Sequence, residues 1–130
     1  MKTKIFFISI LVFTIFVSSF AAEKPTRSKT LKGEVVIDNL IQGLNSNNEG
    51  LKSSSAYYLG ELKSTHAVIP LLRVLKDDPN DESRIMAALS LIKIGDGRGV
   101  YAVKQASKYD SSERVRKLCA GFYNDFLLNK

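Results

Sequence analysis

The chain has 130 residues, of which 45% are hydrophobic and 25% are charged, and its formal net charge is +6. This length and composition fit one folded domain and exclude a disordered or low-complexity chain. The single cysteine cannot form an internal disulfide, so packing must stabilise the domain.

The first element of the chain is an apolar segment with the features of a secretory signal peptide. Two lysines precede the apolar run 5–20, and Ser19 and Ala21 place small residues where a signal peptidase requires them. The run is shorter than the roughly 20 residues that span a bilayer, which disfavours the alternative of a retained membrane anchor. We therefore predict a signal peptide over 1–21, cleaved after Ala21 or Ala22. The mature protein would have no membrane span and would be periplasmic or secreted.

The basic character of the chain is concentrated in the residues that follow. Without the signal peptide, seventeen basic and thirteen acidic residues leave a net charge of +4. Residues 23–32 contain four of these basic residues and one acid, so residues 33–130 have a charge of only +1. We expect a basic, flexible linker over 22–32, with contact to anionic lipid or cell-wall polymer as an alternative role. The nearly neutral remainder is not expected to bind nucleic acid.

Residues 33–130 repeat with a period of 32, and the matched positions keep their chemical type. The columns include Lys52, Arg84 and Arg116, then Ala56, Ala88 and Ala120, and then Leu59, Leu91 and Tyr123. The same shift relates Val36, Val68 and Val100, so each unit is longer than one helix. We predict a domain over 33–130 with three repeats at about 33–64, 65–96 and 97–129.

Each repeat is predicted to contain two helices, because its apolar residues recur three and four positions apart. We expect the first pair over 33–44 and 49–63, and the third pair over 98–107 and 112–129. In the second pair, Thr65 and Asp81 are the expected N-caps, and Gly95 suits the C-terminal end. Ser111 or Ser112 is the expected cap of the last helix.

Small residues on the second helices indicate how the pairs stack. Ala56, Ala88 and Ala120 allow each second helix to approach its neighbour closely. The helix over 83–94 is apolar nearly all round, as expected for a buried helix in the middle of a stack. The predicted fold is therefore all-α, an α-α superhelix (solenoid) of three helix pairs.

The segments AYYLGELKSTHAVIPLL and AALSLIKIGDGRGVYAV resemble the short HEAT repeat, a variety also found in phycobilisome lyases. The resemblance extends from Gly33 to about Leu128. HEAT units commonly have a proline that bends the first helix, and Pro70 lies at that position. They also have an acid in the turn six residues before a basic residue of the second helix.

The resemblance thus implies that Asp78 pairs with Arg84 and Asp110 with Arg116. Lys52 departs from this pattern because serine precedes it by six residues, and terminal repeats are often degenerate. We interpret these five residues as a structural ladder of ion pairs that joins successive turns. The alternative is a basic binding stripe formed by the lysine and the two arginines. If the ladder is exposed, each pair contributes only about 0.2–1 kcal/mol.

No arrangement of residues in the sequence is typical of catalysis or metal binding. His66 is the only histidine and is interpreted as a surface residue, and Cys119 as a small buried side chain rather than a reactive thiol. The glycine-rich stretch 95–99 follows a helix and lacks the phosphate-loop pattern. We predict no catalytic residue, no cofactor and no metal site. A bilin-lyase-like enzyme is an alternative that fold analogy alone supports.

We expect an exported, non-catalytic interaction module, a scaffold or adaptor that binds an unidentified protein on the concave side formed by the second helices. The candidate contact residues are Tyr57, Tyr58, Met86, Ser90 and Lys93. Exposure to solvent or packing between repeats is the alternative for each of them.

A second hypothesis is a homodimer formed through the C-terminal helix. Tyr123, Phe126, Leu127 and Leu128 end this helix, and no fourth repeat follows in the sequence to cover them. Three repeats are close to the minimum for such an array. Pairing of this edge with a second copy would bury the apolar side chains.

Overall fold

The structure is a computed structural model that describes residues 26–130, with side chains from Lys32 onward. The predicted signal peptide, its cleavage site and residues 22–25 of the predicted linker lie outside the described residues. Residues 1–32 and 33–130 form two separate units. The helix packing below concerns the second unit.

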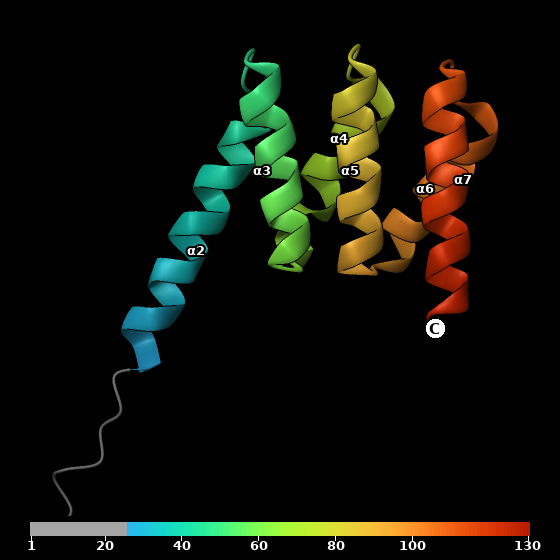
Figure 1. Cartoon of the computed structure of the whole chain (residues 1–130). Coiled ribbons are helices and arrows are strands. Elements are labelled where there is room, and N and C mark those ends of the chain that lie inside the picture. The colour runs from blue at the N-terminus through green and yellow to red at the C-terminus, as the bar shows by residue number, and fades with distance from the viewer. Residues whose placement is uncertain (1–25) are drawn as a thin grey trace, which may run out of the picture. The chain divides into compact units, whose positions relative to one another are not determined.

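Six helices and one short 3-10 turn make up the described part of the chain (Figure 1). They are α2 (Thr26–Gly43), α3 (Glu49–Glu61), η1 (Thr65–Ala67), α4 (Val68–Asp77), α5 (Asp81–Ile94), α6 (Gly97–Tyr109) and α7 (Glu113–Leu128). No strand occurs over residues 26–130, so the all-α prediction is confirmed.

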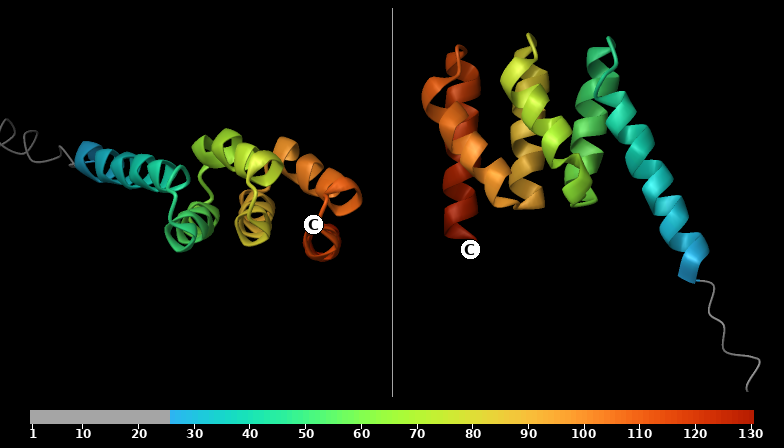
Figure 2. Two further views of the ribbon diagram at one scale, coloured as in Figure 1. Left: turned by 90° about the horizontal axis from the view of Figure 1, so that it is seen from above. Right: turned by 180° about the vertical axis from the view of Figure 1, so that it is seen from behind.

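The helices stack as consecutive antiparallel pairs in two layers. Figure 2 shows α4 and α6 in one layer and α3, α5 and α7 side by side in the other. Helix α5 contacts the second helices on both sides, α3 before it and α7 after it. This arrangement confirms the predicted solenoid of helix pairs. No helix in the described stretch is long and apolar enough to cross a membrane.

The second helices begin at side-chain caps that recur with the period of the repeat. Asn48 accepts the backbone N–H of Leu51 at 2.9 Å, and Asn80 accepts that of Ser83 at 3.1 Å. Ser112 is the corresponding cap of α7, as expected. Each cap satisfies one of the backbone donors that the first helical turn leaves free.

Two expected caps were wrong. Asn80 caps α5, so Asp81 is the first helical residue and its carboxylate is free to bind other groups. Thr65 lies within the 3-10 turn, whose backbone bonds lead directly into α4, and α4 has no side-chain cap. Gly95 ends α5 with a φ of 75°, a left-handed conformation that glycine adopts without strain.

Helix α2 begins at Thr26, which corrects both the expected start near Gly33 and the expected linker. The backbone of residues 26–32 is helical rather than a flexible connection. This stretch has no proline, and arginine, lysine and leucine are good helix formers. Its high charge was therefore not evidence against a helix.

The core runs continuously through the three helix pairs. Its largest fully buried apolar side chains are Leu59, Leu71, Leu91, Val68, Val103, Val115 and Cys119. Helix α5 is the most enclosed, with seven buried residues, as expected for the middle of the stack. Ala56 and Ala88 are buried, and their counterpart Ala120 in α7 is half-buried.

Helices α3 and α5 approach each other closely, backbone to backbone. A Cβ atom added to Gly60 would lie 2.8 Å from the Cα of Ser90. The Ser90 hydroxyl donates to the carbonyl oxygen of Ala56 at 2.6 Å and to that of Met86 at 2.9 Å. Small residues on both helices therefore bring the two backbones together.

Candidate functional site

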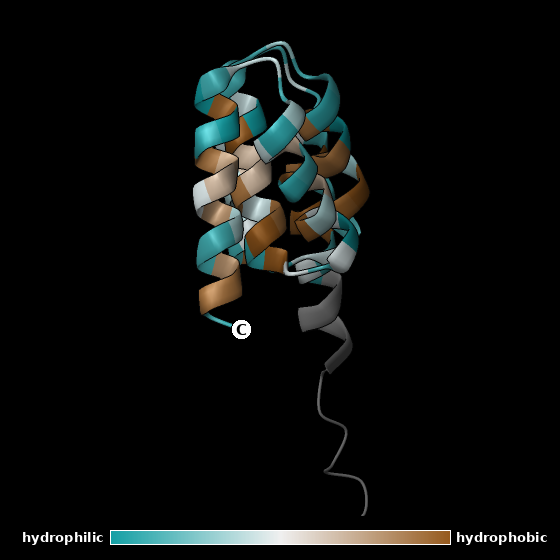
Figure 3. Cartoon of the chain, turned by 90° about the vertical axis from the view of Figure 1, so that its right-hand side faces the viewer, coloured by the Kyte–Doolittle hydropathy of each residue, from teal (hydrophilic) through white to brown (hydrophobic). Residues whose placement is uncertain are grey.

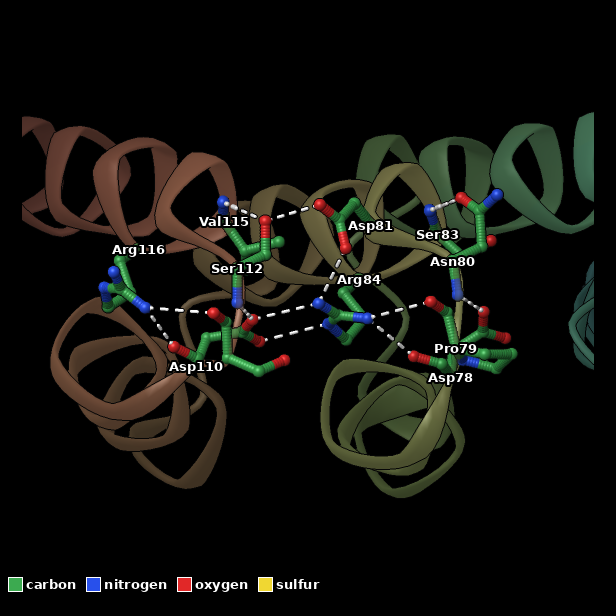
Figure 4. Close-up of polar contacts among 11 residues, drawn as sticks. Asp78, Pro79, Asn80, Asp81, Ser83, Arg84, Asp110, Ser112, Val115 and Arg116 are labelled. Atoms are coloured by element: carbon green, nitrogen blue, oxygen red, sulfur yellow. Dashed lines mark hydrogen bonds and ion pairs between the residues drawn. The ribbon is translucent and has the colours of Figure 1, made fainter.

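Ion pairs join four of the five predicted ladder residues, and these pairs connect neighbouring repeats. Lys52 Nζ donates to Asp78 Oδ2 at 2.6 Å. Arg84 binds both carboxylate oxygens of Asp110, through Nε at 3.1 Å and Nη2 at 2.9 Å (Figure 4). The pairing of Asp78 with Arg84 and of Asp110 with Arg116 was thus wrong for the carboxylates. Each acid pairs instead with the basic residue of the preceding repeat.

Within its own repeat, each arginine binds backbone carbonyls of the turn. Arg84 Nη1 donates to the carbonyl oxygens of Asp78 at 2.9 Å and Pro79 at 3.2 Å. Arg116 Nη1 does the same with Asp110 at 2.6 Å and Ser111 at 3.2 Å. The spacing between the acid and the arginine therefore places the guanidinium over the loop backbone, and the aspartate side chain points elsewhere.

The aspartate side chain of each turn also fixes the turn itself. Asp78 Oδ1 accepts the N–H of Asn80 at 3.0 Å, and Asp110 Oδ1 accepts that of Ser112 at 2.9 Å. Ser46 Oγ accepts the N–H of Asn48 at 3.0 Å in the first turn. Serine at this position keeps the local turn but supplies no negative charge.

The ladder is largely shielded from solvent, in contrast to the exposed pairs considered from sequence. The side chains of Asp78, Arg84 and Asp110 are each 8% exposed, and that of Lys52 is 11% exposed. The hydrogen bond that Arg84 donates to Asp110 raises the pKa of Arg84, and the one that Lys52 donates to Asp78 raises the pKa of Lys52. Loss of one partner would leave a nearly buried charge, so these pairs matter more than surface pairs.

A third group extends the polar contacts between the second and third repeats. Asp81 accepts a hydrogen bond from the Ser112 hydroxyl and one from Arg84 Nη2 at 2.8 Å. The Ser112 bond, with the nearby Arg84, lowers the pKa of Asp81. These contacts use the carboxylate that was expected to cap α5.

Several of the predicted contact residues gather on the exposed side of α3 and α5. Tyr57 and Tyr58 are 40% and 55% exposed, and their rings meet edge to face with centroids 5.5 Å apart. Lys93 Nζ lies 4.7 Å from the centroid of Tyr57 and forms an ion pair with Glu61. The hydrogen bond from Lys93, with one from Tyr57, lowers the pKa of Glu61. We call Tyr57, Tyr58, Glu61 and Lys93 the Tyr57 patch.

Ser90 is not part of this surface, so that candidate was wrong. It is fully buried against Gly60, because α3 and α5 approach so closely. Met86 is half-buried and packs against the core. Glu61 was missed from sequence, although it precedes Lys93 by one repeat period and carries the opposite charge, which together were a usable signal.

A second surface feature, also missed from sequence, is an apolar hollow of about 410 Å³ between α4 and α6. Leu72, Leu75, Ala106 and two exposed tyrosines, Tyr101 and Tyr109, line it. The sequence analysis placed binding only on the second helices and so did not consider the first helices.

The residues examined for catalysis lie apart from these surfaces. His66 is exposed in the 3-10 turn. Cys119 is fully buried, and burial raises the pKa of its thiol to about 12, so the thiol is protonated at neutral pH. Over residues 26–130, no group of three or more side chains could hold a metal ion.

A comparison with protein families matches residues 37–121 to HEAT repeats. The chain belongs to the HEAT-repeat family. Repeats of this family generally mediate protein interaction or scaffolding and are typically non-catalytic. A comparison with curated proteins gives no match.

Proposed function

We propose that this HEAT-repeat protein is an exported, non-catalytic scaffold or adaptor that binds a protein segment across the second helices of its first two repeats. The Tyr57 patch is the observation that supports this site. It combines two exposed tyrosines with an ion pair, and two adjacent repeats contribute to it. Tyrosine is enriched at interfaces because a large, rigid ring buries much area and its hydroxyl can still bind.

The side chains of the patch already contact one another without a partner. Glu61 and Tyr57 lie one turn apart on α3, and Lys93 of α5 contacts both side chains. Contacts of this kind restrict the side chains before binding and so reduce the conformational entropy that binding must offset. Cation–π contacts at exposed sites contribute only about 0.5–1 kcal/mol, so an incoming side chain can replace Lys93 on the tyrosine ring.

Capture of binding partners with matched tyrosine variants tests the site. Tagged mature protein is incubated with envelope extract of the source organism, in parallel with Tyr57→Ser and Tyr109→Ser. We expect Tyr57→Ser to lose the partner and Tyr109→Ser, altered in the hollow on the other layer, to retain it. Loss only with Tyr109→Ser would instead assign binding to the hollow. Retention by both variants would contradict both sites.

The export part of the proposal rests on residues 1–21 and has its own test. Intact-mass and N-terminal sequence analysis of protein from the envelope and medium should find chains that begin at Ala22 or Glu23. Chains that keep the N-terminal methionine and remain inside the cell would contradict export. The result is independent of the binding site.

Self-association through the end of α7 is the second candidate, and the exposure of its apolar residues favours it. Leu127 and Leu128 are 53% and 83% exposed, and Phe126 and Tyr123 are half-buried. Light scattering over a concentration series should then show a dimer that Leu127→Ser with Leu128→Ser returns to a monomer. A monomer at every concentration would remove this candidate.

A further inference from the structure

We propose that the outer side of α7 is a second docking surface, which recognises an acidic helix-capping turn of another protein through Arg116. This inference goes beyond the Tyr57 patch, which lies on α3 and α5. The same arrangement occurs twice within the molecule, where a basic residue of one repeat binds the aspartate of the next turn. We use these two occupied sites as a template for the group that Arg116 would bind in the third repeat.

The occupied copies define the ligand. In both, a basic residue of a second helix binds the aspartate of the next turn, as Lys52 binds Asp78 and Arg84 binds Asp110. The same aspartate accepts the N–H of the residue two positions on, which caps the following helix. The ligand is therefore an aspartate that precedes an Asn or Ser cap by two positions.

Arg116 binds the backbone of its own turn in the same way as Arg84. Its Nη1 donates to two carbonyls of its own turn, at 2.6 and 3.2 Å, and the equivalent bonds of Arg84 are 2.9 and 3.2 Å. Among the side chains that the structure describes, no carboxylate forms an ion pair with Arg116. Figure 4 shows Arg116 at the end of the ladder, bonded only to the turn, while Arg84 is bonded on both sides.

The residues around Arg116 correspond to those around Lys52 and Arg84 in the first two repeats. Ala120 is half-buried, and its counterparts Ala56 and Ala88 are covered by the next helix pair. Glu113 is the counterpart of Glu49 and Asp81. Glu49 and Asp81 each accept a hydrogen bond from a serine hydroxyl of the next repeat. Figure 3 looks onto this end of the array, where hydrophilic and hydrophobic segments alternate along α7. This surface matches a capped helix rather than a purely apolar partner.

The charges argue against a second copy of the chain as the occupant. The turn before α3 has Ser46 where the later turns have aspartate, so a head-to-tail copy offers no carboxylate to Arg116. Two α7 surfaces that face each other in parallel would bring two Arg116 side chains together, and like charges in an interface are unfavourable. Self-association through Leu127 and Leu128 would use the opposite end of this helix. A different protein with an Asp-x-Ser or Asp-x-Asn turn at the start of a helix would offer Arg116 the carboxylate.

A peptide titration followed by NMR tests this proposal. The probe is the capped peptide of residues 106–118, which contains Asp110 and Ser112, and its control differs only by Asp110→Asn. The labelled protein is the mature chain, and the reporter is the Nε–Hε signal of Arg116. We expect a saturable shift of this signal with the aspartate peptide. We expect at least about tenfold weaker binding with the asparagine peptide, which lacks the charge.

Two variants of the protein complete the test. Arg116→Gln should lose peptide binding and lower the thermal midpoint only slightly, because it removes no ion pair and only two hydrogen bonds to carbonyls of its own turn. The amide signal of Ala120 serves as reporter in that variant. Arg116→Lys should bind more weakly than arginine, because lysine cannot hold both carboxylate oxygens in a planar fork.

No saturable shift at millimolar aspartate peptide, or equal affinity for the two peptides, would overturn the proposal. So would undiminished binding by Arg116→Gln. The titration reports on Arg116 and the capture experiment on Tyr57, so either surface can fail while the other stands.

Discussion

The junction between the first and second repeats differs in construction from the junction between the second and third. At the first, Gly60 and Ser90 bring the backbones of α3 and α5 into close contact, and Lys52–Asp78 is its ladder pair. At the second, the counterparts of these two residues are Ile92 and Phe122, both half-buried. That junction has a bidentate Arg84–Asp110 pair, and Arg84 also donates to Asp81. A serine hydroxyl donates to a carboxylate at both junctions, from Ser83 to Glu49 at the first and from Ser112 to Asp81 at the second.

The contrast shows that one repeat spacing accommodates two kinds of contact. The constant period of the sequence determines which positions of neighbouring repeats meet. The sizes of the side chains then determine how closely the helices approach, because protein interiors are close-packed. We therefore expect the first junction to be sensitive to added volume and the second to loss of charge and to acid.

The largest expected effect comes from a charge in the seam that both junctions share. Ala88 is fully buried, so Ala88→Arg places an unpaired charge between helices and should lower the free energy of unfolding by about 3–5 kcal/mol. Urea denaturation followed by circular dichroism measures it. Ala120→Arg, the same change at the half-buried counterpart, should have a much smaller effect. Equal stability of Ala88→Arg and the parent would refute the packing of this seam.

The ladder pairs come next. Arg84→Gln leaves the carboxylate of Asp110 nearly buried without its partner and should lower the free energy of unfolding by about 3 kcal/mol. Lys52→Gln should have a smaller effect, because Lys52 donates to a single oxygen of Asp78. The same denaturation measurement compares the two. A larger loss with Lys52→Gln would reverse our assignment of the stronger pair to the second junction.

Replacing each of two glycines by alanine distinguishes the effect of added side-chain volume from the effect of helix propensity. Gly60→Ala should destabilise the protein by about 1–3 kcal/mol, because the new Cβ meets the backbone of Ser90 at 2.8 Å. A Cβ atom added at Gly121 would have nothing within 4 Å, so Gly121→Ala should stabilise α7 by about 1 kcal/mol. Thermal melts of both variants report the difference. If both variants were stabilised, the close contact of α3 with α5 would be wrong.

The smallest expected effect is the loss of stability at low pH that Asp81 of the second junction causes. The pKa of Asp81 is lowered from its ordinary 3.8 in the folded protein, so its contribution is present above that value. It is lost as the pH falls below 3.8 through the lowered pKa. Urea midpoints from about pH 7 to about pH 2.5 should therefore fall less steeply for Asp81→Asn than for the parent below about pH 4. Parallel curves would show that Asp81 is not linked to folding.

Much of the fold could be predicted because periodicity is a local property of the sequence. The spacing of Val68, Leu71 and Leu75 indicated a helix, and the repeated alanines indicated the order of stacking. The candidate site was harder to predict. Tyr57 and Lys93 lie together at one surface, as expected, whereas Ser90 is buried under α3. Helical periodicity gives the direction of a side chain but not the distance to the neighbouring helix.

The start of α2 and the pairing of the ladder show the same limit. Residues 26–32 were expected to be a linker because of their charge, yet their helix propensity is adequate. The spacing of Asp78 and Arg84 was interpreted within one repeat, but the carboxylate binds Lys52 of the preceding one. A partner in another repeat becomes visible only when the repeats are stacked.

The sequence by itself determined that this protein is a stack of helical hairpins, since repeats long enough for only two helices depend on their neighbours for burial. It also determined which positions would be equivalent. Only the tertiary structure decided which acid joins which base, how near α3 comes to α5, and which tyrosines remain exposed. These depend on distances between segments far apart in the chain, and such distances follow from packing of all the side chains together.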